Sequence, residues 1–267
     1  MEPMRFDTPG ELQIKINIPS GTVRLEASET ATTDVVFERV KEPKNLVVRL
    51  DPAPGGHRLT IEQKGGKFAF SSGKDLVIGV RCPQGARVEM SSGSADFTAH
   101  GRLGAIQFRS GSGDVEFDDV DADVSVKVGN GDVTGGRIGG DLTVNSASGD
   151  IRVSAVGGSL SAKSASGDMD VDAIDGSVTI TSVSGDVRLG SLRRGTTNLR
   201  SVSGDVEIGV AAGTEVFMDV RSTSGDARSD LTAAEGPLDS HPLELKVLSV
   251  SGDVRIRRAP ARSALSA

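Results

Sequence analysis

The stretch Ser164–Gly190, SASGDMDVDAIDGSVTITSVSGDVRLG, repeats one short pattern, and that pattern decides the fold. It reads Ser-Gly-Asp, continues with alternating apolar and polar residues, reads Asp-Gly-Ser, alternates again and returns to Ser-Gly-Asp. A fixed internal period is the sequence signature of a repeat architecture. The stretch therefore predicts a chain built from copies of one short unit.

Two interleaved ladders of glycine give the length of that unit. The first ladder advances by 18 residues four times and then by 19, 21 and 27. Its glycines are Gly113, Gly131, Gly149, Gly167, Gly185, Gly204, Gly225 and Gly252, with Ala95 one step before them. The second ladder is Gly104, Ala122, Gly140, Gly158, Gly176, Gly195 and Gly213. The unit is thus two halves of nine residues, and we expect the glycines to permit left-handed turns between strands.

Alternation within each half predicts a half-buried strand. The second and fourth residues after the glycine are mostly apolar, as in Ile151 and Val153, and the third is polar. A further apolar residue follows at the seventh position: Val120, Ile138, Val156, Ile174 and Leu192. Two strands per unit predict an all-β fold, a β-solenoid of 18-residue coils with two nine-residue half-repeats each. Successive coils would stack about 4.8 Å apart.

The two ends depart from the period. Residues 1–90 lack it, but read as strands separated by turns, and predict an N-terminal β cap over the open end of the solenoid. Residues 91–257 carry the repeats, which become irregular after residue 226, where LTAAEGPLDSHPLE (231–244) interrupts them. Residues 258–267 read as a flexible tail.

Composition narrows the classes of partner and site. The net charge is −7, which argues against nucleic acid or an anionic membrane as the main partner. The single cysteine, Cys82, has no partner for a disulfide or a metal site and reads as a small buried hydrophobe. Tyr and Trp are absent and Phe is rare, which suits a narrow aliphatic core.

Neither a signal peptide nor an apolar run long enough to span a membrane is visible, so we expect no membrane insertion. The default location is the cytoplasm, although a trimmed secreted form, or one associated with a surface, would have the same composition.

A column of aspartates is the strongest candidate site. Its members, Asp114, Asp132, Asp150, Asp168, Asp186, Asp205 and Asp226, would repel each other by about 1 kcal/mol per neighbour in water. One interpretation is that each carboxylate accepts backbone N–H groups at its turn. The alternative is a row of calcium sites, although calcium β-rolls use a different repeat, in which glycine does not directly precede aspartate. We expect no cofactor.

Other columns and acidic runs have structural readings beside their functional ones. Arg152, Asp170, Arg188, Glu207 and Arg228 alternate in sign and would form an exposed salt-bridge ladder. Two serine columns flank each turn, and their hydroxyls could bond along the stack, but no histidine lies between His100 and His241 to activate one. The acidic runs at 116–123 and 168–175 could suggest a polysaccharide-cleaving β-helix. Alternation makes them a solvated face.

Three segments resemble those of a known family: LQIKINIPSGTVRLEAS (12–28), DLVIGVRCPQGARVEM (75–90) and the serial SGDV units. Together they are similar to the bacterial "putative adhesin" family of β-strand-repeat proteins, a domain of unknown function, over about residues 5–257. The resemblance implies a bacterial β-solenoid and says little about activity.

The expected function is a non-enzymatic β-solenoid scaffold or protein-interaction module, adhesin-like, that binds a protein partner or itself. One alternative is a polymer-forming, bactofilin-like cytoskeletal protein, which would stack end to end. The other is a polysaccharide-acting β-helix enzyme, with a cleft near SLRRGTTN (191–198) or EGPLDSHP (235–242), where the repeat breaks.

Overall fold

A computed structural model describes residues 3–38, 46–63, 76–231 and 242–260. These residues form strands, turns and bends, and none of their segments is a helix that could span a membrane. Parts of the expected cap region (1–2, 39–45 and 64–75), His241, most of the 231–244 interruption and most of the 258–267 tail lie outside the described residues. The chain divides into two compact units, Met1–Gly139 and Gly140–Ala267.

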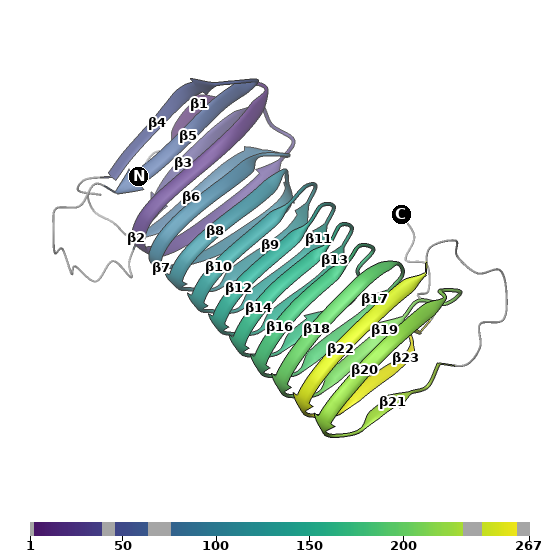
Figure 1. Ribbon diagram of the computed structural model, residues 1–267. Helices are drawn as coiled ribbons and strands as arrows, with labels where there is room; N and C mark the ends of the chain where they lie inside the picture. The colour runs from purple at the N-terminus through teal and green to yellow at the C-terminus, as the bar shows by residue number, and fades with distance from the viewer. Residues whose placement is uncertain (1–2, 39–45, 64–75, 232–241, 261–267) are drawn as a thin grey trace. The chain divides into compact units, whose positions relative to one another are not determined.

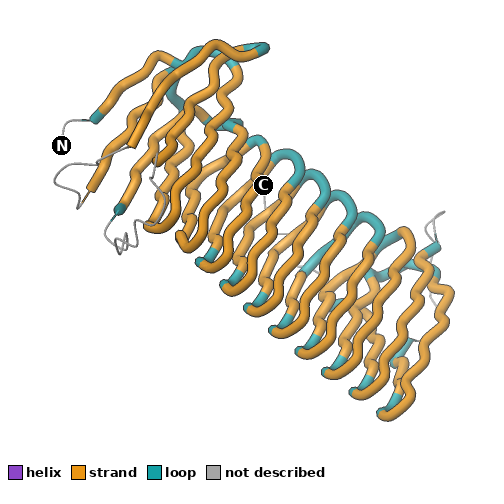
Figure 2. Tube along the Cα trace, turned by 60° about the vertical axis from the view of Figure 1, so that its left-hand side comes forward, coloured by secondary structure: helices purple, strands orange, loops and turns teal. Residues whose placement is uncertain are grey.

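Both units are β-solenoids in which each coil supplies one strand to each of two sheets (Figures 1 and 2). In the second unit the coils pair in parallel and in register, so that Leu142 lies beside Leu160 and Leu160 beside Val178. The prediction of an all-β solenoid of 18-residue coils is confirmed. The strands of the regular part are β12 (Leu142–Ser148), β13 (Ile151–Val156), β14 (Leu160–Ser166), β15 (Met169–Val171), β16 (Val178–Ser184), β17 (Val187–Leu192), β18 (Gly195–Ser203) and β19 (Val206–Val210).

The core lies between the two sheets and consists of the predicted inward positions. Ile151 and Val153 are 1% and 3% exposed, and the residues at the seventh position are equally buried. Each inward side chain therefore packs on its equivalent one coil away, which explains why every coil has the same apolar pattern. The core needs little aromatic volume because the inward columns are mostly Val, Ile and Leu.

The two glycine ladders have different physical causes. All eight glycines of the Ser-Gly-Asp ladder have positive φ, between 111° and 146°, as the turn prediction required. In the second ladder Gly104, Gly158 and Gly176 do not, so the expected left-handed turn is wrong there. A Cβ at Gly176 would lie 2.4 Å from the carbonyl oxygen of Gly158. Those glycines permit close approach of neighbouring coils instead.

The first unit begins with a coil that the period did not reveal. Strand β2 (Glu11–Ser28) pairs in parallel with β7 (Arg87–Leu103) over nearly its whole length, and Gly21 lies beside Ala95. Strands β5 (Gly56–Gln63) and β6 (Val77–Pro83) pair in parallel with the other edge of β2. The boundary expected at residue 90 thus falls inside β7. The unit continues with β8 (Ala105–Ser112), β9 (Val115–Val120), β10 (Val124–Asn130) and β11 (Val133–Ile138).

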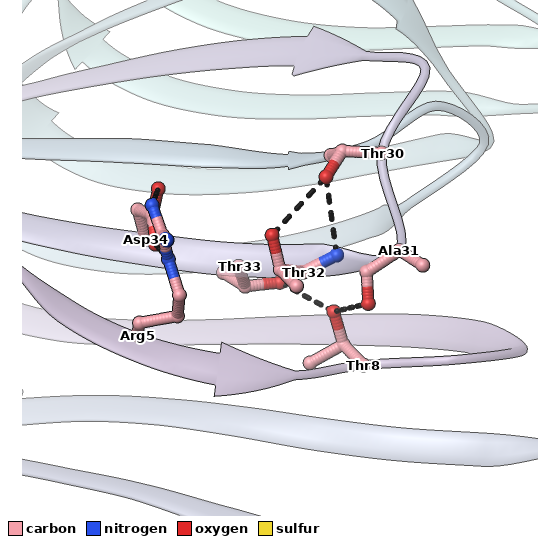
Figure 3. A network of polar contacts seen from close by, with 7 residues as sticks. All are labelled: Arg5, Thr8, Thr30, Ala31, Thr32, Thr33 and Asp34. Carbon is pink, nitrogen blue, oxygen red and sulfur yellow. Dashed lines mark hydrogen bonds and ion pairs between the residues drawn. The ribbon is translucent and has the colours of Figure 1, made fainter.

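An N-terminal β cap of antiparallel strands closes the first coils. Strand β4 (Leu46–Ala53) pairs with β5, β3 (Thr32–Glu38) pairs with β6, and β1 (Met4–Asp7) pairs with β3. Figure 3 shows how β1 is held: the hydroxyls of Thr8 and Thr33 are 2.8 Å apart and buried, and Arg5 lies 2.8 Å from Asp34. The Arg5 guanidinium, through this hydrogen bond, lowers the pKa of the Asp34 carboxyl.

The last coil of the sequence is not the last coil in space. Strand β22 (Leu243–Ser251) lies between β18 and β20 (Val216–Ser224), and β23 (Val254–Arg258) lies between β19 and β21 (Ala227–Ser229). Figure 1 shows the yellow β22 among green strands. Inserting the terminal coil pairs both of its edges. The outermost position passes to β20 and β21, whose residues are largely exposed.

This coil order predicts the relative cost of two substitutions at paired positions. Leu245 is 0% exposed and its neighbour Met218 is 46% exposed. Leu245→Ala should lower the free energy of unfolding by about 2–5 kcal/mol, because it leaves a cavity in a packed core. Met218→Ala should cost under about 1 kcal/mol. Urea denaturation of both variants measures the difference, and a larger cost at Met218 would contradict the order of the coils.

Candidate functional site

The aspartate column forms a ladder of hydrogen bonds between coils. In the second unit the Oδ1 of each aspartate accepts the backbone N–H of the next aspartate in the stack, at 2.8–2.9 Å. The order is Asp150, Asp168, Asp186, Asp205, Asp253 and Asp226. In the first unit Asp96, Asp114 and Asp132 do the same at 3.1 and 2.9 Å. Each carboxylate thus partners a main-chain donor at a turn, where the regular strand pairing is interrupted.

This geometry matches the structural interpretation in kind but not in detail. The accepted N–H belongs to the neighbouring coil and not to the aspartate's own turn. Asp96 and Asp253, which were not among the predicted members, complete the column. The signal for Asp253 was its own Ser-Gly-Asp triplet, displaced by the 27-residue step.

Arginines neutralise part of the charge along the column. The Arg152 guanidinium lies 2.7 Å from Asp150, and that of Arg228 lies 2.7 Å from Asp226. The N–H of Asp168, assisted by Arg152, holds the pKa of the Asp150 carboxyl below its ordinary value of 3.8. The ionised carboxylate is the form that the ladder favours.

The aspartate column does not gather its carboxylates into a cluster of metal ligands. Within the described ranges, no three His, Cys, Asp or Glu side chains converge as metal ligands. One oxygen of each paired carboxylate already accepts an N–H group. The seven aspartates proposed as calcium ligands are therefore placed as a one-dimensional row.

The alternating-charge column is only partly as predicted. Asp170 lies between Arg152 and Arg188 in register, and Arg188 is 3.7 Å from it. The expected pairing of Glu207 with Arg228 is wrong, because the inserted strand β23 places Arg255 between them. Glu207 of β19 instead contacts Arg257, which also belongs to β23.

The serine columns do not form the continuous hydrogen-bonded stack that was considered. Ser92 and Ser110 are bonded at 2.8 Å, but Ser164 donates to the carbonyl of Ser166 within its own turn. The buried hydroxyls of Ser146, Ser182, Ser201 and Ser249 have no partner among the described residues. The described serine side chains therefore form no continuous hydrogen-bonded column, and the pairing of their strands keeps them in register.

The remaining candidate groups are dispersed. Cys82 is buried in β6, and burial raises the pKa of its thiol to about 12, so the thiol stays protonated. His57 lies near the carbonyl of Pro9, and His100 is 3.5 Å from Asp118. Within SLRRGTTN, Arg193 lies 3.7 Å from Asp175. Among the described residues, neither histidine lies with a hydroxyl group and a carboxylate in the arrangement of a catalytic triad.

Open grooves lie on the outer surfaces of both units. One of about 510 Å³ crosses β2, β7 and β8 in the first unit, where Lys15 pairs with Glu89 at 3.2 Å. Another, of about 350 Å³, follows the end of the aspartate ladder between Asp186 and Asp226. Its aspartates are members of the ladder, and Glu207 supplies a further carboxylate.

Exposed apolar side chains are concentrated in the second unit. Three of them, Val183, Val202 and Val250, are 48–49% exposed and occupy the same position in successive turns, between two serines. Ala147 and Ala165 continue the column and are also exposed. These five residues are called the apolar ridge below. Phe217, Met218 and Leu248 are exposed near its end.

The geometry of the coils agrees with a comparison against protein families. The model of the Toastrack DUF4097 family matches residues 12–257, which is most of the chain. The chain belongs to the Toastrack DUF4097 family. The resemblance seen in the sequence, to bacterial adhesin-like repeat proteins of unknown function, is confirmed.

Solved structures similar to this Toastrack chain share little sequence with it. A "putative adhesin" from Bacteroides fragilis has 12% identity and a TM-score of 0.45, with 96% of each chain covered. One from Parabacteroides distasonis has 12% identity and a TM-score of 0.38, with 95% of this chain and 96% of the other covered. A "putative cell adhesion protein" from Clostridium sporogenes has 10% identity and a TM-score of 0.25, covering 96% and 100%. A search of curated proteins gave no match.

The ladder predicts how substitutions at Asp168 separate its two roles. Asp168→Asn keeps an oxygen that can accept the N–H of Asp186 and removes one charge from the column, so stability should be unchanged or slightly higher. Asp168→Ala leaves that N–H without its side-chain partner and should cost about 1 kcal/mol. Urea denaturation in EDTA and in millimolar calcium measures both. Strong calcium stabilisation of the parent chain, lost in both variants, would contradict the structural role.

Acidification should weaken the second unit through Asp150. A carboxyl whose folded pKa lies below 3.8 contributes stability that is present above the unfolded value and is lost as the pH falls through the folded value. The melting temperature should therefore decrease when the pH is lowered below about 4. Asp150→Asn should fall less over the same range, as followed by circular dichroism. An identical acid response in the variant would show that Asp150 does not contribute.

Proposed function

We propose that this Toastrack chain is a non-enzymatic scaffold whose apolar ridge binds a protein partner. The main observation behind this proposal is the ridge itself, in which three valines are about half exposed and lie in register along one line of turns. Exposed apolar side chains that gather on one surface commonly mark an interaction site. The exposed serine that follows each valine (Ser184, Ser203 and Ser251) places polar groups beside the ridge, as the rims of protein interfaces do.

Rigidity supports a binding role. The ridge residues lie on strands β12, β14, β16, β18 and β22. Within the second unit, every one of these strands except β12 is paired on both edges, and the serines beside the ridge residues are in register. A partner would therefore meet a preformed row of side chains with a spacing of about 4.8 Å. Little conformational entropy would be lost by the scaffold on binding.

The groups that could support catalysis are used within the fold. In the groove of about 350 Å³, Asp186, Asp205 and Asp253 accept main-chain N–H groups and Asp226 pairs with Arg228. The described part of that unit contains no histidine. These observations favour binding over polysaccharide cleavage. The antiparallel cap at β4, β3 and β1 likewise favours a discrete scaffold over a bactofilin-like polymer, since it covers the first coils, which head-to-tail stacking would use.

A phage-displayed random peptide library tests the binding role without a known partner. Peptides selected on the full chain should lose at least about tenfold in affinity for a variant with Val183→Ser, Val202→Ser and Val250→Ser. The matched control changes Thr179, Asn198 and Lys246 to alanine, at outward positions of the same three strands, four residues before each valine. It should bind as the parent does. Circular dichroism melts establish that each variant folds.

Selected peptides that bind both variants equally would place the binding site elsewhere and contradict the role of the ridge. Release of reducing sugar from a panel of bacterial polysaccharides by the parent chain would contradict the non-enzymatic assignment.

A further inference from the structure

The outermost coil of the second unit has an unpaired edge among the described residues. Strand β20 pairs with β22 on one side, and β21 pairs with β23. The inward-facing residues of β20 are more exposed than their neighbours in β22: Met218 is 46% exposed, whereas Leu245 is fully buried. An exposed edge of this kind is a template for pairing with another strand.

The direction of the main-chain groups of β20 follows from one hydrogen bond and the alternation of a strand. The N–H of Leu243 donates to the carbonyl of Glu215, and in a strand the N–H and C=O of one residue point the same way while those of the next point opposite. Glu215, Phe217, Asp219 and Arg221 therefore point towards β22. Val216, Met218, Val220 and Ser222 direct their N–H and C=O groups to the outer edge.

The charges beside this edge are self-complementary about Val220. Asp219 and Arg221 flank it on the outer face and pair with each other at 3.0 Å. If two β20 strands pair antiparallel with Val220 opposite its copy, Asp219 of each chain lies directly opposite Arg221 of the other. Centring on Asp219 or on Arg221 would instead oppose like charges, which is unfavourable.

The second sheet has the same property about Ser229. The N–H of Asp230 donates to the carbonyl of Ile256, so Ser229, one residue earlier, directs its groups to the outer edge. Antiparallel pairing centred on Ser229 places Arg228 opposite Asp230 of the other chain. Val220 and Ser229 are each the second inward-facing residue from the turn at Gly225, so one two-fold axis through both sheets satisfies both pairings.

We propose that the β20–β21 edge is the interface of a two-fold symmetric dimer of this chain. The occupant is a second copy because the charge pattern of each strand complements its own reverse and fixes the register. A two-fold contact of this type is closed and does not extend into a filament. The interface goes beyond the proposed function, since it uses the end of the stack and not the apolar ridge.

Light scattering with size-exclusion chromatography, over a concentration series of the full chain, tests the proposal. The mass should rise towards twice 27.6 kDa. Asp219→Arg places arginine opposite Arg221 of the other chain and should return the mass to that of a monomer. The double variant with Asp219→Arg and Arg221→Asp restores opposite charges in the same register and should restore the dimer.

Glu244→Arg is the control, since it makes the same change of charge on the outer face of β22, one strand inside the edge, and should leave the dimer intact. Thermal melts verify folding of every variant. A parent chain that stays monomeric at all concentrations would overturn the proposal, and so would a dimer that Asp219→Arg leaves unchanged. A monomer that still binds ridge-dependent peptides would overturn this interface and leave the proposed function intact.

Discussion

Parallel, in-register pairing of one coil with the next is the constraint on which the rest of this structure depends. It places each inward residue on its own equivalent, as with Leu160 beside Val178 in the sheet that begins with β12. Columns of Val, Ile and Leu then fill a narrow interior. A residue of the wrong size would pack poorly against its equivalents in both adjoining coils. The same pairing aligns each turn with the next. The glycines with positive φ and the aspartates that follow them are therefore repeated because the turn is repeated.

The aspartate ladder shows how the stacking resolves an electrostatic problem that it creates. A row of like charges is unfavourable, yet each carboxylate in the column faces a backbone N–H donor of the adjoining coil. The interaction lowers the pKa of Asp150 and joins turns where strand pairing is interrupted. The aspartate column that first suggested calcium binding thus also has a structural role, in main-chain hydrogen bonding between coils.

Most of the fold could be predicted from the local period of the sequence. Residues such as Ile151, Val153 and Val156 were assigned inward from their spacing alone, and they are buried. The order of coils at the two ends was not predictable in the same way. Strand β2 pairs with β7 across a gap of more than fifty residues, and β22 inserts between strands that precede it in sequence. A period describes adjacent copies, whereas insertion depends on which edges are paired, and this is a property of the whole stack.

The candidate site was predictable in composition and not in geometry. The column of aspartates was visible in the sequence, but the donor that each one accepts belongs to the next coil, so only the stacked structure identifies it. In Ser182–Ser184 the alternation buries Ser182 and directs Val183 outwards, and only the exposed Ser184 departs from it. The ridge exists because an outward position of the repeat carries an apolar residue.

Engineered disulfides test the order and register of the coils most directly. Asn198 lies beside Lys246, and Lys246 lies beside Asp219, so Asn198 and Asp219 are two strands apart, about 9.6 Å. A disulfide requires Cα atoms within about 7 Å. The account predicts that Asn198→Cys with Lys246→Cys oxidises within one chain, detected by mass spectrometry, and that Asn198→Cys with Asp219→Cys does not. Efficient intramolecular oxidation of the second pair, without the first, would show that β22 is not inserted and would contradict the structure.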